Sequence, residues 1–174
     1  KKYIELPKFG SINIHASLLP KYRGAAPIQW ALMSGDSFTG VSIFQIEKKV
    51  DTGGIIHQEK IKIQSEDNFE TLSVKLSELG SKALIKSLRL IENDDFKLLV
   101  QDNKKLTRAP KIKKEMLRIN WFWEAEKINN WVRGLSPLPG MYTFYGGKKL
   151  KIFKTRVVNS DKELSVGKIE VINL

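Results

Sequence analysis

The sequence of 174 residues contains no cysteine and no long apolar run. The lack of cysteine excludes disulfide bonds and thiolate metal sites, and it agrees with a reducing compartment. No stretch of about 18 apolar residues is present, so we expect no membrane span and no membrane partner. The first residues also lack the succession of charged, apolar and small residues that marks a signal peptide. Together these absences favour a cytoplasmic globular protein.

Both ends of the chain suggest that it is part of something longer. It begins with Lys1 rather than methionine, and it ends at Leu174 within an alternating apolar stretch. We therefore expect a piece of a longer protein that lacks an N-terminal part and the end of its last domain. The length present suffices for one medium domain or one and a half small ones.

Positive charge is concentrated in the second half of the chain. Residues 1–103 carry 14 Lys and Arg against 13 Asp and Glu, whereas residues 104–174 carry 16 against 6. The net charge of +11 therefore resides almost entirely in the C-terminal part. A neutral body joined to a basic appendage is typical of proteins that bind a polyanion such as nucleic acid. The alternative is a lysine-rich surface that serves solubility alone.

The first half predicts alternating strands and helices. We expect strands at 11–16, 41–46 and 55–63, and helices at 25–34 and 69–93. The longer helix should begin at a capping box in which Asp67 accepts backbone N–H groups and Glu70 reaches back. One apolar stripe of this helix should face the core, and it consists of Phe69, Leu72, Leu76, Leu79, Ala83 and Leu88.

The second half predicts a small unit of short strands with one helix. We place a domain boundary between 107 and 108, within a polar crossing segment at 94–114. Beyond it we expect a helix at 124–133, a proline-containing loop at 134–140 and strands at 141–145, 150–157 and 165–172. Gly146 and Gly147 should form a hairpin turn between the first two of these strands. Several short strands separated by turns suggest a small barrel or sandwich.

Only two histidines, His15 and His57, are available for acid–base chemistry. Asn13 and His15 stand two positions apart on a predicted strand, so both side chains leave its polar face. The strand opens into a loop containing Pro and Gly, and ligands bind at the carboxyl ends of strands in open α/β sheets. Asn13 can donate an amide N–H to a developing oxyanion, and His15 can exchange a proton near neutral pH. His57 stands between Ile56 and Gln58 within a strand, and we assign it a structural role.

A carboxylate that orients the imidazole is the remaining requirement, and Asp51 is the candidate. It opens a glycine-rich turn at 51–54 directly after a predicted strand, which would fix its position. Sequence spacing alone leaves open whether Asp51 reaches His15.

Two segments resemble the signature of the folate-dependent formyltransferases. The first reads Ile-Asn-Ile-His-Ala-Ser-Leu-Leu-Pro at 12–20 and continues as Tyr-Arg-Gly-Ala-Ala-Pro-Ile at 22–28. The second reads Val-Asp-Thr-Gly at 50–53, and it follows at the separation that the family requires, with Asp51 standing 38 positions after Asn13. The resemblance implies an α/β fold, namely the C-terminal part of a Rossmann-like formyltransferase domain.

The resemblance also implies roles for individual residues. Asn13, His15 and Asp51 correspond to the catalytic trio of the family. The loop that borders the folate corresponds to Ser17, Leu18, Leu19 and Pro20. The implied formyl donor is 10-formyltetrahydrofolate, and the implied reaction requires no metal.

The C-terminal half is similar to that of the methionyl-tRNA formyltransferases within this family. The similarity lies in 108–112, 118–121 and 132–140, with departures at Asn120, where the family usually has Asp, and at Ser136 and Leu138, where it has Asn and Trp.

This second similarity implies two domains and a nucleic-acid substrate. A catalytic domain at 1–107 would precede an incomplete OB-like β-barrel at 108–174 that binds initiator methionyl-tRNA, in a protein that acts as a monomer. Phosphate contacts are expected from six lysines: Lys111, Lys113, Lys114, Lys148, Lys149 and Lys151.

Two alternatives remain open. Another folate-dependent N-formyltransferase, acting on an amino sugar, would share the same catalytic residues. A non-catalytic RNA-binding relative would keep the fold, and its function would not depend on Asn13 or His15.

Overall fold

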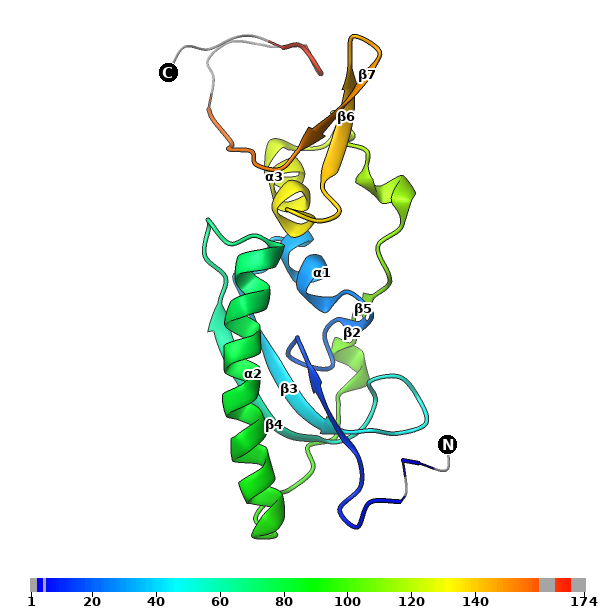
Figure 1. Cartoon of the computed structure of the whole chain (residues 1–174), viewed down its shortest axis with the longest axis vertical. Helices are drawn as coiled ribbons and strands as arrows, with labels where there is room; N and C mark the ends of the chain where they lie inside the picture. Colours follow the sequence, from blue (N-terminus) through cyan, green and yellow to red (C-terminus); the bar gives the residue numbers. More distant parts are fainter. Residues whose placement is uncertain (1–2, 5, 160–164, 170–174) are drawn as a thin grey trace.

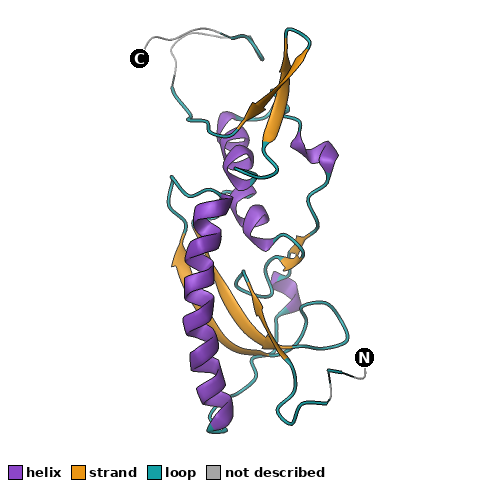
Figure 2. Cartoon of the chain, in the orientation of Figure 1, coloured by secondary structure: helices purple, strands orange, loops and turns teal. Residues whose placement is uncertain are grey.

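The computed structural model describes residues 3–4, 6–159 and 165–169, and its larger part is an antiparallel sheet covered by one long helix (Figure 1). The sheet has the order β1-β3-β4, formed by Ile12–His15, Phe38–Gln45 and Ile55–Lys62. Helix α2, at Phe69–Glu92, runs along the sheet and contacts β3 and β4 (Figure 2). The predicted strands and the long helix are therefore confirmed, with β3 starting three residues earlier than expected.

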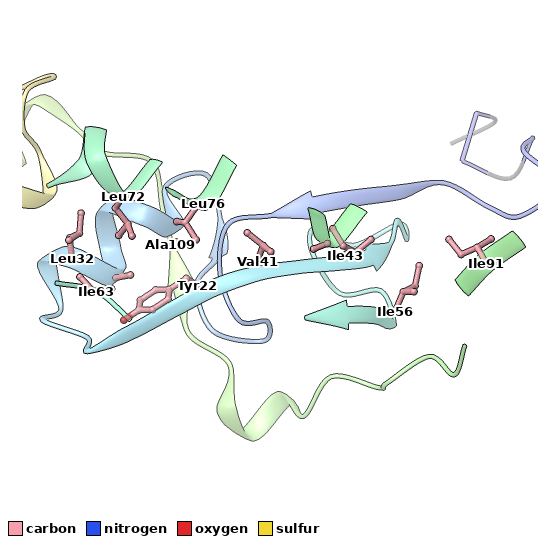
Figure 3. Packing of buried hydrophobic residues seen from close by; sticks show 12 residues of the cluster. Tyr22, Leu32, Val41, Ile43, Ile56, Ile63, Leu72, Leu76, Ile91 and Ala109 are labelled. Atoms are coloured by element: carbon pink, nitrogen blue, oxygen red, sulfur yellow. The ribbon is translucent and has the colours of Figure 1, made fainter. Parts of the chain in front are cut away.

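Helix α2 buries a stripe that differs in part from the predicted one. The buried residues of this helix are Leu72, Leu76, Gly80, Ala83, Ser87 and Ile91. Figure 3 shows three of them, Leu72, Leu76 and Ile91, within the apolar cluster. The prediction was wrong for Leu88, which is 48% exposed. Gly80 belongs to the stripe because a Cβ there would lie 3.3 Å from a methyl group of Ile14 on β1. Small residues thus let the helix approach the sheet closely.

The first turn of α2 is capped by residues other than those predicted. Asn68 accepts a hydrogen bond from the Thr71 backbone N–H, and the Thr71 hydroxyl oxygen accepts one from the Asn68 N–H. Asp67, the expected cap, lies one residue earlier and is buried. Its carboxylate accepts hydrogen bonds from the Gln64 N–H at 2.8 Å and from the Lys75 ammonium at 2.6 Å. Asp67 therefore connects the loop before the helix to the helix surface.

A short parallel pair joins two segments far apart in the chain. Strand β2, at Arg23–Gly24, pairs with β5, at Arg108–Ala109. Ala109 is fully buried in the cluster of apolar residues between the sheet and α2. The segment around 108 thus packs on the first half of the chain. The described strands form both antiparallel and parallel pairs. The division at 107/108 stays a prediction.

The second half contains the predicted helix and hairpin, but the second strand of the hairpin spans 148–152 rather than the predicted 150–157. Helix α1, at Pro27–Met33, packs against α3, at Ala125–Gly134. Strands β6 and β7, at Met141–Tyr145 and Lys148–Ile152, pair as a hairpin. Its turn residues Gly146 and Gly147 have φ of +54° and +75°, as a two-residue type I′ turn requires. Short 3-10 helices lie at Asn103–Lys105 and Lys114–Leu117.

The predicted third strand of this half is absent from the part that the structure describes. Residues 165–169 form no strand, and residues 170–172 lie outside the described ranges. The sheet formed by β6 and β7 has two strands, and no sheet among the described residues closes into a barrel. The structure supports an α/β protein, and the barrel stays a prediction.

A second apolar cluster joins the two halves. Met33 of α1 packs with Ile119, Val132, Leu135 and Met141. Nearby, the Trp30 indole N–H donates a hydrogen bond to the Pro110 carbonyl at 2.8 Å. Across the described ranges, no helix combines the length and apolar character needed to cross a bilayer.

We predict that Asp67 stabilises the fold in a pH-dependent way. Burial by itself raises the pKa of Asp67, but the hydrogen bonds from Lys75 and Gln64 outweigh it and hold this pKa below its usual 3.8. A carboxylate with a lowered pKa stabilises the folded state at pH values above its usual pKa. This contribution shrinks below the usual pKa and is lost as the pH falls through the lowered pKa of the folded state. Asp67→Asn should lower the free energy of unfolding by about 2 kcal/mol at pH 7.

Urea denaturation at pH 7 and pH 3 measures this effect. The difference in unfolding free energy between Asp67→Asn and the unchanged protein should shrink at pH 3. At that pH the aspartate of the unfolded chain is mostly protonated and therefore neutral, as the asparagine is. Glu70→Gln is the matched control, an exposed carboxylate in the same turn that should cost less than about 1 kcal/mol. A gap of equal size at both pH values would contradict the prediction.

Candidate active site

His15 is buried at the end of β1, with one ring nitrogen fixed by the backbone. Its Nε2 lies 2.8 Å from the Tyr22 carbonyl oxygen. Because a carbonyl oxygen only accepts hydrogen bonds, Nε2 must carry a proton. The ring also contacts Phe44 edge-on, with centroids 6.4 Å apart. Proton exchange is therefore confined to Nδ1.

Asp51 places its carboxylate beside that free nitrogen. Its Oδ2 lies 3.7 Å from Nδ1 of His15, and the side chains are only 13% and 7% exposed. The same oxygen accepts a hydrogen bond from the Gly24 N–H at 2.9 Å. The structure thus brings together the end of β1, strand β2 and the turn between β3 and β4. Nδ1 is therefore the ring nitrogen of His15 that faces a carboxylate.

Asn13 lies next to the same turn but differs from the other two residues in exposure. Its side chain is exposed, and it lines a hollow of about 200 Å³ together with Phe44, Val50 and Asp51. Residues two apart on a strand share a face, so Asn13 and His15 leave β1 on the same side. The three candidate residues therefore border one region, with the amide facing the outside and the imidazole within.

The loop after β1 is held by a polar network that the sequence did not reveal. The Ser42 hydroxyl on β3 accepts a hydrogen bond from the Leu19 N–H at 3.0 Å and donates one to the Ser17 carbonyl at 2.6 Å. The Gln58 amide on β4 donates to Ser42 and to the Leu19 carbonyl. Ser17 and Leu19 are buried, whereas Leu18 and Pro20 are partly exposed. Polar residues inside apolar strands were the available signal for this network.

A cationic groove of about 580 Å³ lies on another side of Asp51. Its lining includes Arg23, Lys49, Thr52 and Arg108. Burial lowers the pKa of the Arg23 guanidinium, and the negative charges of Asp51 and Glu47 oppose this shift. This groove would present positive charge to an anionic ligand, next to the turn that carries Asp51.

The second histidine has a structural partner. Nε2 of His57 lies 2.6 Å from the Glu59 carboxylate, which also pairs with Lys86 of α2 at 3.4 Å. The hydrogen bond with His57 is the main reason that the pKa of Glu59 is lowered. This cluster joins β4 to α2. Within the described ranges, no group of three or more His, Asp or Glu side chains could hold a metal ion.

The six lysines proposed for phosphate contacts are all exposed, and they lie on two segments. Lys111, Lys113 and Lys114 precede or begin the 3-10 helix at Lys114–Leu117, and Lys148, Lys149 and Lys151 lie on β7. On β7, the ammonium of Lys149 stands 3.8 Å from the ring centre of Tyr142, and Lys151 donates to the Pro139 carbonyl at 3.1 Å.

Comparison with known proteins places the chain among formyl transferases. Residues 1–88 match the family model described as formyl transferase, and residues 111–173 match the formyl transferase C-terminal domain. The methionyl-tRNA formyltransferase of Caldanaerobacter subterraneus subsp. tengcongensis is 44% identical over 158 residues, which are 91% of this chain and 51% of that protein. That of Caldicellulosiruptor saccharolyticus is 47% identical over 161 residues, 92% of this chain and 51% of that protein. The chain spans about half the length of these curated relatives.

Solved structures share the fold. An N-formyltransferase from Helicobacter canadensis, in complex with folinic acid and dTDP-3-aminofucose, matches with a TM-score of 0.74 at 24% identity, covering 86% of this chain and 55% of that one. HypX from Aquifex aeolicus, in complex with tetrahydrofolic acid, matches with a TM-score of 0.70 at 21% identity, covering 82% and 25%. Both family models match, and together they cover most of the chain, in which His15 and Asp51 lie 3.7 Å apart. The chain therefore belongs to the formyl transferase family.

Proposed function

We propose that this chain carries the catalytic residues of an enzyme that formylates initiator methionyl-tRNA with 10-formyltetrahydrofolate. The observation that carries the proposal is the placement of the Asp51 carboxylate 3.7 Å from the free nitrogen of His15, beside the hollow lined by Asn13. Curated methionyl-tRNA formyltransferases that are 37–47% identical to this chain support the choice of substrate. The complete activity belongs to a polypeptide of the length of those relatives.

The chemistry proposed here is transfer through a tetrahedral intermediate. The amino group of the methionyl ester attacks the formyl carbon on N10 of the folate, and the carbonyl oxygen becomes an oxyanion. The Asn13 amide N–H and protonated His15 stabilise that oxyanion. Asp51 stabilises the imidazolium and, through a water molecule, takes the proton released by the amine. The C–N10 bond then breaks, and N10 leaves with the proton that Asp51 had accepted from the amine, returned through water.

The folate donor is proposed to lie against the loop at 17–20. Because Ser17 and Leu19 are buried, the loop would offer the side chains of Leu18 and Pro20 and its backbone to the ligand. The two hydrogen bonds of Ser42 hold the backbone of this loop in place, which supports a role for the loop as a binding surface for the folate. Solved relatives that share the fold are described with folate compounds bound.

The tRNA is proposed to bind along the basic half, with its aminoacyl end entering the groove near Arg23 and Arg108. We further propose a catalytic domain at 1–107 and an OB-like β-barrel domain at 108–174, in a monomeric cytoplasmic enzyme. The second cluster packs this half onto α1, so the basic surface keeps a fixed position relative to His15.

A sugar N-formyltransferase is the second candidate function. The observation that favours it is the structural match to an enzyme crystallised with dTDP-3-aminofucose. The sequence identities favour the tRNA enzyme, since they reach 47% for relatives of that name against 24% for the sugar enzyme. Turnover of an amino sugar without formylation of methionyl-tRNA would select the second candidate.

The catalytic roles predict a large and specific loss of activity in the full-length protein. His15→Ala and Asn13→Ala should each lower kcat/KM for methionyl-tRNA by at least about 100-fold, because each removes a group that stabilises the oxyanion. Binding of tRNA should be retained. His57→Gln is the matched control and should stay within threefold, since His57 serves the contact between β4 and α2. Near-normal turnover of His15→Ala would contradict the mechanism. A non-catalytic RNA-binding relative would show no formylation in the unchanged protein, and its binding of tRNA would not depend on Asn13 or His15.

The basic half predicts salt-dependent binding of tRNA. The logarithm of the association constant should fall linearly with the logarithm of salt concentration, with a slope of about −0.9 for each phosphate contact. Replacing Lys148, Lys149 and Lys151 with alanine should make this slope shallower. A control that replaces Lys62, Lys82 and Lys97, exposed lysines of the first half, should leave it unchanged. Affinity that is independent of salt would exclude a phosphate-binding surface.

A further inference from the structure

Gln101 is a buried amide that makes four hydrogen bonds, two to the active-site turn and two to Arg23. Its Nε2 donates to the carbonyl of Asp51 at 3.0 Å and to the carbonyl of Gly53 at 2.8 Å. Its Oε1 accepts from Nε and Nη2 of Arg23, at 2.9 Å and 2.6 Å. The side chain is 6% exposed. The partners define which end of the amide is which, because carbonyls only accept and a guanidinium only donates.

The turn that Gln101 contacts holds a conformation that needs external support. Asp51 has a φ of +54°, in the left-handed region that residues other than glycine adopt at a cost. At Gly53 a Cβ would lie 1.7 Å from the Gln45 carbonyl oxygen, so the backbone there lies directly on β3. A buried carbonyl without a hydrogen-bond donor costs about 1–3 kcal/mol. The Gln101 amide supplies that donor to the carbonyls of Asp51 and Gly53.

The same amide is also linked, through Arg23, to the second contact that places the Asp51 carboxylate. Oδ2 of Asp51 accepts its hydrogen bond from the N–H of Gly24, and Arg23 is the residue directly before it. Two guanidinium nitrogens of Arg23 bind the Gln101 oxygen. Gln101 therefore connects the backbone that carries the carboxylate to the strand that donates a hydrogen bond to it. A change in this amide would move both contacts at once.

We propose that Gln101 is a positioning residue that orients the Asp51 carboxylate toward Nδ1 of His15. It acts through Asp51 and has no contact of its own with the reacting atoms. The inference rests on the proposed formyl transfer, in which Asp51 stabilises the imidazolium. Loss of the amide would let the turn relax from its left-handed conformation, and the 3.7 Å approach would no longer be held.

Two substitutions separate the donor from the acceptor function of this side chain. Gln101→Glu keeps oxygen atoms for Arg23 but removes the donor to the two carbonyls. Gln101→Met keeps the length and removes both functions. In the full-length protein each should lower kcat by about 10- to 100-fold, because small displacements of a catalytic group cost that much. KM for both substrates should change less than threefold, since neither substrate loses a contact.

Asn103→Ala is the matched control. Asn103 is exposed, lies two residues further along and accepts a hydrogen bond from Nη1 of Arg23 at 3.2 Å. Its loss removes a partner of the same guanidinium without touching the turn, so kcat should be unchanged. Hydrogen–deuterium exchange of the segment 46–54 supplies a readout that needs no substrate. It should accelerate in both Gln101 variants and stay unchanged in Asn103→Ala.

The outcomes distinguish this inference from the proposed function. An unchanged protein that formylates no amine substrate would overturn the proposed function. An active unchanged protein whose Gln101 variants keep full kcat would overturn the positioning role, whether or not their exchange accelerates. A loss expressed in KM rather than kcat would also overturn it, because Gln101 would then act on binding. Lower kcat with faster exchange at 46–54 supports the inference.

Discussion

The approach of the Asp51 carboxylate to the His15 imidazole is the contact on which the remaining account depends. The two residues come from different segments, and their 3.7 Å separation is maintained by backbone contacts rather than by a direct hydrogen bond. The Tyr22 carbonyl fixes one nitrogen of the ring, and the Gly24 N–H fixes one oxygen of the carboxylate. Since both anchors lie in the loop and short strand after β1, the geometry of that loop determines the geometry of the site.

Helix α2 packs on the face of the sheet opposite to His15 and supports β1 from that side. Ile14 contacts Gly80 of α2, so the next residue, His15, points to the other face. Gly80 and Ser87 allow the helix to pack closely, and the buried hydroxyl of Ser42 on β3 holds the loop on the side of the site. Apolar packing on one face and polar anchoring on the other therefore act on the same short strand.

The sequence predicted the helices and the longer strands well, and the contacts between residues far apart in the chain poorly. Alternation and helical periodicity report burial of whole elements, so the strands, the helices and the glycine hairpin were found. The pair β2–β5 has only two residues per strand, and it depends on tertiary contacts such as the burial of Ala109. Leu88 was assigned to the core on its helical spacing, but it stands one residue, about 100° around the helix, beyond the buried Ser87. It therefore lies outside the buried stripe, which continues to Ile91. Asn13 and His15 could be grouped because they share a strand, whereas Gln101 lies in the mixed crossing segment at 94–114, which carries no periodic signal.

The protonation state of His15 tests the account most directly, because a proton on Nε2 leaves Nδ1 as the ring nitrogen that faces Asp51. Long-range proton–nitrogen NMR spectra of the imidazole report which ring nitrogen carries hydrogen. The account predicts that Nε2 of His15 stays protonated across the neutral pH range, in its hydrogen bond to the Tyr22 carbonyl. A neutral ring with its proton on Nδ1 and an unprotonated Nε2 would contradict it.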